Sequence, residues 1–448
     1  MTPPTADRAG DAGGSAASRG KVAVIGSGVS GLTAAYLLQR RYDVALFEAD
    51  PRLGGHAHTH ELAGHGGRSI AVDSGFIVHN GRTYPLLTRL FGELGVTTQD
   101  TDMSMSVRCE GCGLEYAGAR GLLGLFARPD TALRPDYLRM LGEIKRFHRQ
   151  ARRLLREPPE RDDPDLTLGD FLRGGGYSRF FADHFMVPLV SAVWSTGSIL
   201  VERYPARYLF RFLDHHGMLA VTGSPRWRTV VGGSRTYVER AVKGLTAVHV
   251  STPVRAISRG AEGVRIVDDA GEEHTADRVV IATHADQALR LLADPTETER
   301  AVLGAIPYSC NETLLHTDAA LLPRARAARG SWNYLLAGCA KRPNYGHSHG
   351  TGQAAVVSYH MNRLHRLEEP TNYLVTMNAT ERIRPELVLA RMMYEHPVYT
   401  PESVAAQARL PLLNTTMTAF AGAYHGWGFH EDGCASGVAA AEAFGVTW

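Results

Sequence analysis

The feature that most constrains this 448-residue chain is a strand–turn–helix–strand unit near its start. Residues 21–25 form a short apolar, β-branched run, which predicts a parallel strand buried on both faces. Gly26, Gly28 and Gly31 follow as G-x-G-x-x-G, a pattern that permits a tight turn, close approach of backbone to a pyrophosphate and close helix–strand packing. A helix is predicted over 30–41. Its first turn, with Ser30, would offer free N–H groups to a phosphate.

The second predicted strand, over 44–47, ends at an acidic residue. Glu48 stands twenty residues after Gly28, where a carboxylate can hydrogen-bond the ribose hydroxyls of an adenosine and disfavours a 2′-phosphate. Gly54 and Gly55 extend the pattern beyond the acid. NAD dehydrogenases do not need this second glycine pair, whereas FAD proteins of the glutathione-reductase-like class typically carry one. The unit therefore predicts FAD.

Two later stretches repeat dinucleotide-binding features in the expected order. A hairpin turning at 268–271 precedes a buried strand over 279–282, which would place the small residues Ala282 and Thr283 beside the dinucleotide. Near the C-terminus, an apolar strand and a glycine-rich turn lead to an alanine-rich helix predicted over 434–444, directly after Glu431 and Asp432. The N-terminus of that helix can stabilise negative charge on a reduced flavin.

These motifs, together with the stretches GGHAHTH, PLVSAVWS and GFHEDG, resemble the flavin-containing amine oxidoreductase superfamily over residues 20–448. That superfamily includes monoamine oxidases, protoporphyrinogen oxidase and phytoene-desaturase-like enzymes. Within it, the motifs resemble those of a bacterial branch of predicted NAD/FAD-binding proteins. The resemblance implies FAD as cofactor. It also implies that Val254 meets the adenine through its backbone and that His56, where many members carry Arg, lies by the flavin. An acid often follows the last Ala-Gly in the family, but this chain has Ala423, so either Glu431 or Asp432 is expected to contact the ribityl chain.

The expected architecture is α/β. A Rossmann-like, glutathione-reductase-like FAD-binding domain would comprise 21–80, 218–298 and 409–448. An inserted α+β substrate domain would comprise 81–217 and 299–408, with a helical part at 121–217. Residues 1–20, rich in Ala, Gly, Ser and Thr, are expected to form a disordered tail.

Several classes of protein and site are disfavoured by composition. A net charge of +2 without a basic run gives no case for nucleic acid, and five cysteines, an odd number, favour a reducing compartment. The most apolar stretch, 185–201, is too short and interrupted for a membrane span, so we expect a cytoplasmic protein with at most peripheral membrane contact. No metal is expected: neither the histidines of 56–60 nor the lone pair Cys109-x-x-Cys112 has a second set of ligands, although a redox disulfide remains an alternative.

No Ser/His/Asp set or metal cluster suggests covalent catalysis, so the chemistry is expected to come from the flavin. The leading hypothesis is an FAD-dependent oxidoreductase that removes a hydride from a largely apolar substrate, a lipid or other small molecule. Members of the resembled branch often accompany cyclopropane-fatty-acid-synthase-like methyltransferases, which implies a methylated fatty-acyl chain and its desaturation.

Two alternatives stay open. One is amine oxidation, for which Trp427 with Tyr424 or Tyr359 could form an aromatic cage, although only Lys341 stands where such oxidases place a lysine. The other is a non-redox use of FAD. A catalytic base is not identified: His56, His360 and His430 are candidates by position, as are Trp427 and Tyr359 for substrate contact. The electron acceptor and the oligomeric state are also left open.

Overall fold

A computed structural model describes residues 19–158, 166–195, 197–220, 223–339 and 355–448. The expected disordered tail, 1–20, therefore lies almost entirely outside the described residues, and Lys341 lies outside them too. No helix in the described ranges combines the length and the apolar character that crossing a membrane requires.

The predicted nucleotide-binding unit forms the middle of a five-stranded parallel sheet with the order β10-β2-β1-β14-β20. Its strands are β1 (Lys21–Ile25), β2 (Asp43–Phe47), β10 (Ala247–His249), β14 (Arg278–Ile281) and β20 (Thr418–Phe420). The middle strand β1 is buried apart from Lys21, as its apolar run predicts. The Rossmann-like α/β class is thereby confirmed.

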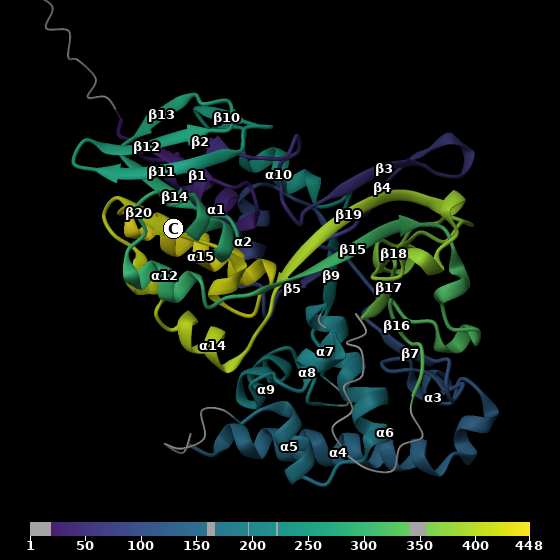
Figure 1. Ribbon diagram of the computed structural model, residues 1–448. Helices are drawn as coiled ribbons and strands as arrows, with labels where there is room; N and C mark the ends of the chain where they lie inside the picture. The colour runs from purple at the N-terminus through teal and green to yellow at the C-terminus, as the bar shows by residue number, and fades with distance from the viewer. Residues whose placement is uncertain (1–18, 159–165, 196, 221–222, 340–354) are drawn as a thin grey trace, which may run out of the picture.

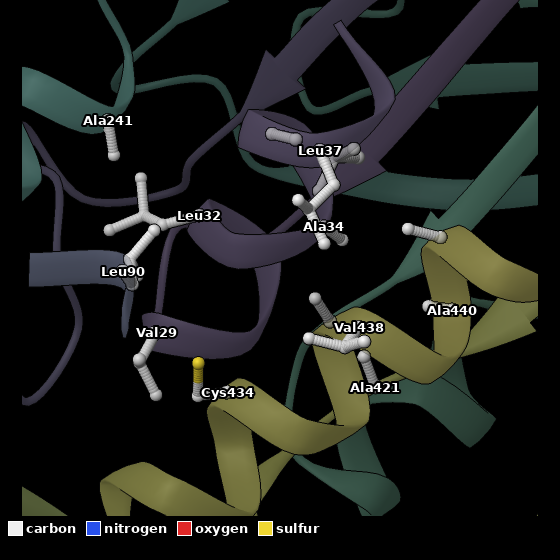
Figure 2. Packing of buried hydrophobic residues seen from close by; sticks show 14 of the residues in the cluster. Val29, Leu32, Ala34, Leu37, Leu90, Ala241, Ala421, Cys434, Val438 and Ala440 are labelled. Atoms are coloured by element: carbon white, nitrogen blue, oxygen red, sulfur yellow. The ribbon is translucent and has the colours of Figure 1, made fainter. Parts of the chain in front are cut away.

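Helix α1 (Val29–Leu38) follows the glycine turn and packs against α15 (His430–Ala443), the last helix of the chain (Figure 1). Figure 2 shows the small side chains that face each other between the two helices, with Val29 near Cys434 and Ala34 near Val438. Gly437 permits this approach, because a Cβ there would overlap the carbonyl oxygen of Ser30. The first and last motifs of the sequence are thus held together by one helix pair.

A mixed seven-stranded sheet, in the order β19-β15-β18-β17-β16-β7-β8, forms the second large layer. All neighbours are antiparallel except β16 and β7, which are parallel. Its strands are β7 (Met105–Cys109), β8 (Glu115–Ala117), β15 (Tyr308–His316), β16 (Trp332–Leu336), β17 (Val356–His360), β18 (Leu374–Met377) and β19 (Val388–Pro397). Strands β7 and β8, which precede the helical segment in the sequence, thus join strands of residues 308–397 in one sheet.

Helices of residues 121–215, where a helical part was expected, gather at one end of this sheet and share one aromatic core with it (Figure 1). They are α3 (Gly121–Leu125), α4 (Pro135–Arg156), α5 (Leu168–Gly174), α6 (Arg179–Phe181), α7 (Val187–Trp194), α8 (Ser198–Val201) and α9 (Ala206–His215), with one π-helical turn at Ala182–Met186. We refer to this group as the helical subdomain.

The remaining elements connect these layers. They are the strands β3 (Thr59–Ala63), β4 (Ser69–Asp73), β5 (His79–Asn80), β6 (Thr98–Asp100), β9 (Trp227–Val230), β11 (Val254–Gly260), β12 (Gly263–Asp268) and β13 (Glu273–Ala276), and the helices α2 (Pro85–Glu93), α10 (Arg235–Ala241), α11 (Ala285–Leu291), α12 (Glu297–Leu303), α13 (Met361–Leu364) and α14 (Pro401–Gln407).

Two predicted helix boundaries are wrong. Helix α1 ends at Leu38, three residues before the predicted end at Arg41. Helix α15 begins at His430, four residues before the predicted start, and Glu431 and Asp432 therefore lie inside its first turn. In α15 the carboxylate of Asp432 accepts a hydrogen bond from the backbone N–H of Phe429, which caps the helix earlier than the alanine-rich run suggests.

Candidate functional site

The described residues enclose a large cavity of about 820 Å³ at the carboxyl ends of β1, β2 and β14. Its wall here includes Ile25, Phe47, Glu48 and Ala282. Open parallel sheets bind their ligands at this edge. The cavity continues from there to the seven-stranded sheet and the helical subdomain, so one space joins the dinucleotide motifs to the inserted segments.

The three glycines of the first motif serve different purposes. Gly26 adopts φ +98°, and a Cβ there would lie 2.7 Å from the carbonyl oxygen of Ala282. A Cβ at Gly31 would overlap the carbonyl oxygen of Gly26, so Gly31 is required for helix–strand packing and does not line the cavity. Gly28 lines the cavity, and a Cβ there would meet nothing within 4 Å. Gly28 therefore keeps clear a space that the protein itself does not fill.

The N-terminus of α1 opens onto this space. Gly28 is its N-cap residue, so no side chain satisfies the first N–H groups, and Val29 and Ser30 of the first turn line the cavity. Free N–H groups at a helix N-terminus suit an anionic group such as a phosphate.

Glu48 borders the same cavity and is fixed by a network that the sequence did not reveal. Its carboxylate accepts hydrogen bonds from the backbone N–H and the hydroxyl of Ser27 and from the backbone N–H of Asp50. The Ser27 hydroxyl also accepts a hydrogen bond from the N–H of Gly54, at 3.0 Å. This network ties the glycine turn to the second glycine pair.

In the second glycine pair, too, one residue serves packing and the other lines the cavity. Gly54 has φ +111° and packs against Ala57 and Val238 away from the cavity, whereas Gly55, with φ +56°, lines it. Three residues of the second motif, Val254, Ala282 and Thr283, also lie on the wall. The structure thus brings together most of the predicted cofactor contacts.

Glu431 and Asp432 do not line this cavity. The Glu431 carboxylate accepts hydrogen bonds from the N–H groups of Leu86 and Leu87, at 2.9 and 3.0 Å, and so caps helix α2. Burial raises the pKa of Asp432 to about 7. Their place on the wall is taken by the preceding residues Gly428, Phe429 and His430.

Four histidines that line the cavity lie near one another: His56, His284, His396 and His430. Burial lowers the pKa of all four, to about 4 for His396 and about 3 for His430, and neighbouring histidines lower the pKa of His56 further. These rings are therefore neutral at pH 7. The Nε2 atoms of His56 and His430 have no hydrogen-bond partner among the described residues. The alternation of β19 could have indicated His396, but only His56 and His430 stood out in the sequence.

Only some of the candidate catalytic and substrate-contacting residues line the cavity. Tyr359 lines the cavity, with its ring edge-on to Trp332 at 5.3 Å between centroids. His360, the next residue on the strand, points elsewhere and lies near Asn372, with 3.1 Å between His360 Nε2 and the amide oxygen. Trp427 is not on the wall either, whereas Tyr424 is.

The helical subdomain supplies an uncharged wall. Its lining residues, and the loop after α9, include no Asp, Glu, Lys or Arg among the described residues: Ala192, Val193, Trp194, Ser195, Phe212, His216 and Met218. Trp332 faces them from the seven-stranded sheet, and its indole N–H has no partner among the described residues. The described lysines, Lys21, Lys145 and Lys243, do not line the cavity.

Comparison with known families identifies the class. The model of the flavin-containing amine oxidoreductases matches residues 29–371, and the chain belongs to this family. It is an oxidoreductase with FAD as its cofactor. Comparison with curated protein sequences gives no match.

Similar folds occur among solved structures. They include cyclohexylamine oxidase from Brevibacterium oxydans IH-35A (TM-score 0.66, 15% identity, 95% of this chain and 98% of that chain covered). A putrescine oxidase variant gives a TM-score of 0.63 at 15% identity, with 95% and 98% covered. A CLA-producing fatty acid isomerase from P. acnes gives 0.63 at 16% identity, with 93% and 97% covered. At such identities the likeness shows the fold.

The residues present fit FAD. The open space at Gly28 and the uncapped N-terminus of α1 suit a pyrophosphate, and the carboxylate of Glu48 suits a ribose. The unpartnered Nε2 atoms of His56 and His430 supply hydrogen-bonding groups farther along the same cavity.

Proposed function

We propose that this oxidoreductase removes a hydride from a largely apolar substrate and that the substrate is a fatty-acyl chain. The resemblance to the bacterial branch implies that this chain is methylated. The observation that carries the proposal is the uncharged wall of the helical subdomain, formed by residues such as Val193, Phe212 and Met218. A charged substrate group would lose hydration there without gaining a partner, whereas a hydrocarbon chain would be stabilised by burial.

We assign the cofactor contacts to the residues that border the cavity at the carboxyl edge of the parallel sheet: Gly26, Gly28, Ser30, Glu48, Gly55, His56, Val254, Ala282 and Thr283. Bound FAD supplies a hydride acceptor. The protein contributes a dry, apolar wall that orients the substrate. The neutral rings of His56 and His430 contribute hydrogen-bonding nitrogens without adding positive charge.

Amine oxidation is the second candidate. Tyr359, Trp332 and Tyr424 give the cavity an aromatic lining that could flank an amine. Trp427, the residue expected to complete a cage, is not on the wall, and the described lysines are absent from it. Non-redox use of FAD is the third candidate, and the fold shared with a fatty acid isomerase is consistent with it.

Anaerobic reduction separates the three candidates. We expect the flavin band of the purified protein to bleach on mixing with bacterial phospholipid or fatty acids and to persist with a panel of amines. Bleaching by amines alone would replace the proposal with amine oxidation. A flavin that dithionite reduces but no lipid or amine does would favour the non-redox reading.

Two variants connect the result to the apolar wall. Val193→Trp should slow bleaching by lipid at least about tenfold by narrowing the cavity, while dithionite still reduces its flavin at the wild-type rate. Val250→Trp, at an exposed position outside the cavity, is the matched control and should behave as wild type. Equal lipid rates in all three proteins would contradict the assignment of this wall to the substrate.

We also propose that the protein is cytoplasmic and meets membranes peripherally. Leu122, Leu123 and Leu133 are 74%, 81% and 83% exposed within one short segment that also carries Arg120 and Arg128. Exposed leucines suit the apolar boundary of a bilayer, whereas Arg120 and Arg128 are already paired with Asp102 and Asp130. Co-sedimentation with phosphatidylglycerol vesicles should fall in Leu122→Ser/Leu123→Ser and persist in Leu412→Ser, which changes a leucine that is 73% exposed elsewhere. Equal binding by both variants would contradict this surface.

A further inference from the structure

A second group of reactive side chains lies apart from the cavity, where the lone Cys109-x-x-Cys112 pair had seemed to lack partners. Cys109, Cys112, His184 and Cys339 each offer one ligand atom, and these four atoms all lie within 4.8 Å of one another. None of the four residues lines the cavity. No second set of ligands stands near this pair in the sequence, whereas the fold brings a histidine and a single cysteine to it from distant segments.

We propose that these residues form a closed structural zinc site of the Cys₃His type. In tetrahedral zinc with Zn–S bonds of about 2.3 Å and a Zn–N bond of about 2.0 Å, ligand atoms are about 3.5–3.8 Å apart. The distance from Cys112 Sγ to His184 Nε2 is 3.4 Å, and the limit of 4.8 Å for all pairs leaves only a small contraction on binding. Four protein ligands leave no open position, which is typical of structural sites.

The histidine presents the nitrogen that zinc needs. His184 Nδ1 lies 3.1 Å from the carbonyl oxygen of Phe180, and a carbonyl can only accept, so Nδ1 carries the proton. The lone pair of Nε2 is then directed at the thiols. A metal-bound histidine usually donates its other ring N–H to a carbonyl or carboxylate in this way. Stacking on the ring of Phe180, with 4.0 Å between centroids, fixes the orientation of the imidazole further.

The backbone around the group is shaped for convergence. Cys109 and Cys112 flank the turn between β7 and β8, where the N–H of Gly113, which adopts φ +71°, donates to the Cys109 carbonyl at 2.9 Å. Gly111 lets the third cysteine approach, because a Cβ there would lie 2.7 Å from the backbone nitrogen of Cys339. His184 stands in the π-helical turn Ala182–Met186, an irregularity often found at functional positions.

Burial distinguishes this group from incidental surface thiols. Cys109 and His184 are each 1% exposed, and Cys112 and Cys339 are half-buried. On binding, the three thiols would release their protons to solvent, and Zn²⁺ with three thiolates and a neutral imidazole would carry one negative charge. The ion would fasten the seven-stranded sheet to the helical subdomain, since its ligands come from the β7–β8 turn, the π-helical turn and the loop after β16.

Metal analysis of the full-length protein tests the site directly. The protein is purified without a metal-affinity tag under reducing conditions, and zinc and flavin are measured on the same sample. We expect about one zinc ion per chain. Cys112→Ser and Cys339→Ser should each lower the zinc content at least about tenfold. Cys310→Ser, which changes an exposed cysteine outside the group, is the matched control and should keep its zinc.

A second measurement does not depend on the folding of the variants. Wild-type protein exchanged with Co²⁺ should show the intense d–d bands of tetrahedral cobalt and thiolate-to-cobalt charge transfer. Wild-type protein that contains no zinc and takes up neither Zn²⁺ nor Co²⁺ under reducing conditions would overturn the proposal. So would a Cys109–Cys112 disulfide in protein from freshly lysed cells, or zinc that persists in both ligand variants.

Discussion

Gly28→Ala is the sharpest test of the cofactor site, because the structure separates its effect on binding from its effect on folding. Gly28 has φ −62° and ψ 173°, which alanine adopts without strain. A Cβ there would meet no protein atom within 4 Å, so we expect the stability of the flavin-free protein to change by less than about 1 kcal/mol. The methyl group would instead occupy the space assigned to FAD.

Forcing a methyl group into a filled site typically costs about 1–3 kcal/mol, which corresponds to a Kd for FAD raised about 5- to 150-fold. Flavin titration of the flavin-free protein measures this change, and thermal unfolding of the same samples measures stability. Gly31→Ala is the matched control: its Cβ would overlap the carbonyl oxygen of Gly26, so the flavin-free protein itself should lose stability. Wild-type FAD affinity in Gly28→Ala, or equal destabilisation by both variants, would refute this reasoning.

Three further outcomes are expected. Glu48→Gln should raise the Kd for FAD about tenfold or more through the loss of charged hydrogen bonding, measured by flavin titration; unchanged affinity would remove Glu48 from the site. Burial lowers the pKa of His316 to about 4, so unfolded protein binds this proton from about pH 6.5 downward while folded protein does not. The free energy of unfolding should therefore fall between pH 6.5 and 4, by up to about 3 kcal/mol from this residue. Denaturant titrations at several pH values should show that the free energy of unfolding of His316→Gln falls less steeply over this range than that of wild type. An identical pH dependence in both proteins would contradict this. Glu431→Ala should lower the free energy of unfolding, measured by thermal denaturation, by about 1–2 kcal/mol because it uncaps α2, while flavin content stays the same. Loss of flavin at unchanged stability would instead indicate that Glu431 contacts the cofactor.

The parallel sheet and its glycine turn were predictable because local chemistry determines them. The apolar run that forms β1 and the spacing of Gly26, Gly28 and Gly31 each need only neighbouring residues to be interpreted. The third motif was predicted less well. Alanine content suggested a helix from residue 434, but capping by Asp432 extends it back to His430. Capping depends on one side-chain hydrogen bond, which composition does not reveal.

Contacts between distant segments were the least predictable. Ser27 joins Glu48 to Gly54 through hydrogen bonds that no spacing rule indicates. Cys339 stands 227 positions after Cys112 in sequence, yet the parallel pairing of β16 with β7 brings both to the same end of these two strands. A pattern search along the chain treats the cysteine pair as isolated, because the partner strand lies on the far side of the helical insertion.

The division of the cavity wall follows from this topology. The paired strands β15 and β19 extend from the seven-stranded sheet toward the parallel sheet, and β19 brings Tyr394 and His396 to the cavity (Figure 1). The ring of His56 lies 4.9 Å from Tyr394 and 5.3 Å from His396, between centroids. His56, which we assign to the cofactor, therefore contacts β19 directly. A substitution on β19 should consequently change both flavin binding and substrate oxidation, whereas one on the helical subdomain should change substrate oxidation alone.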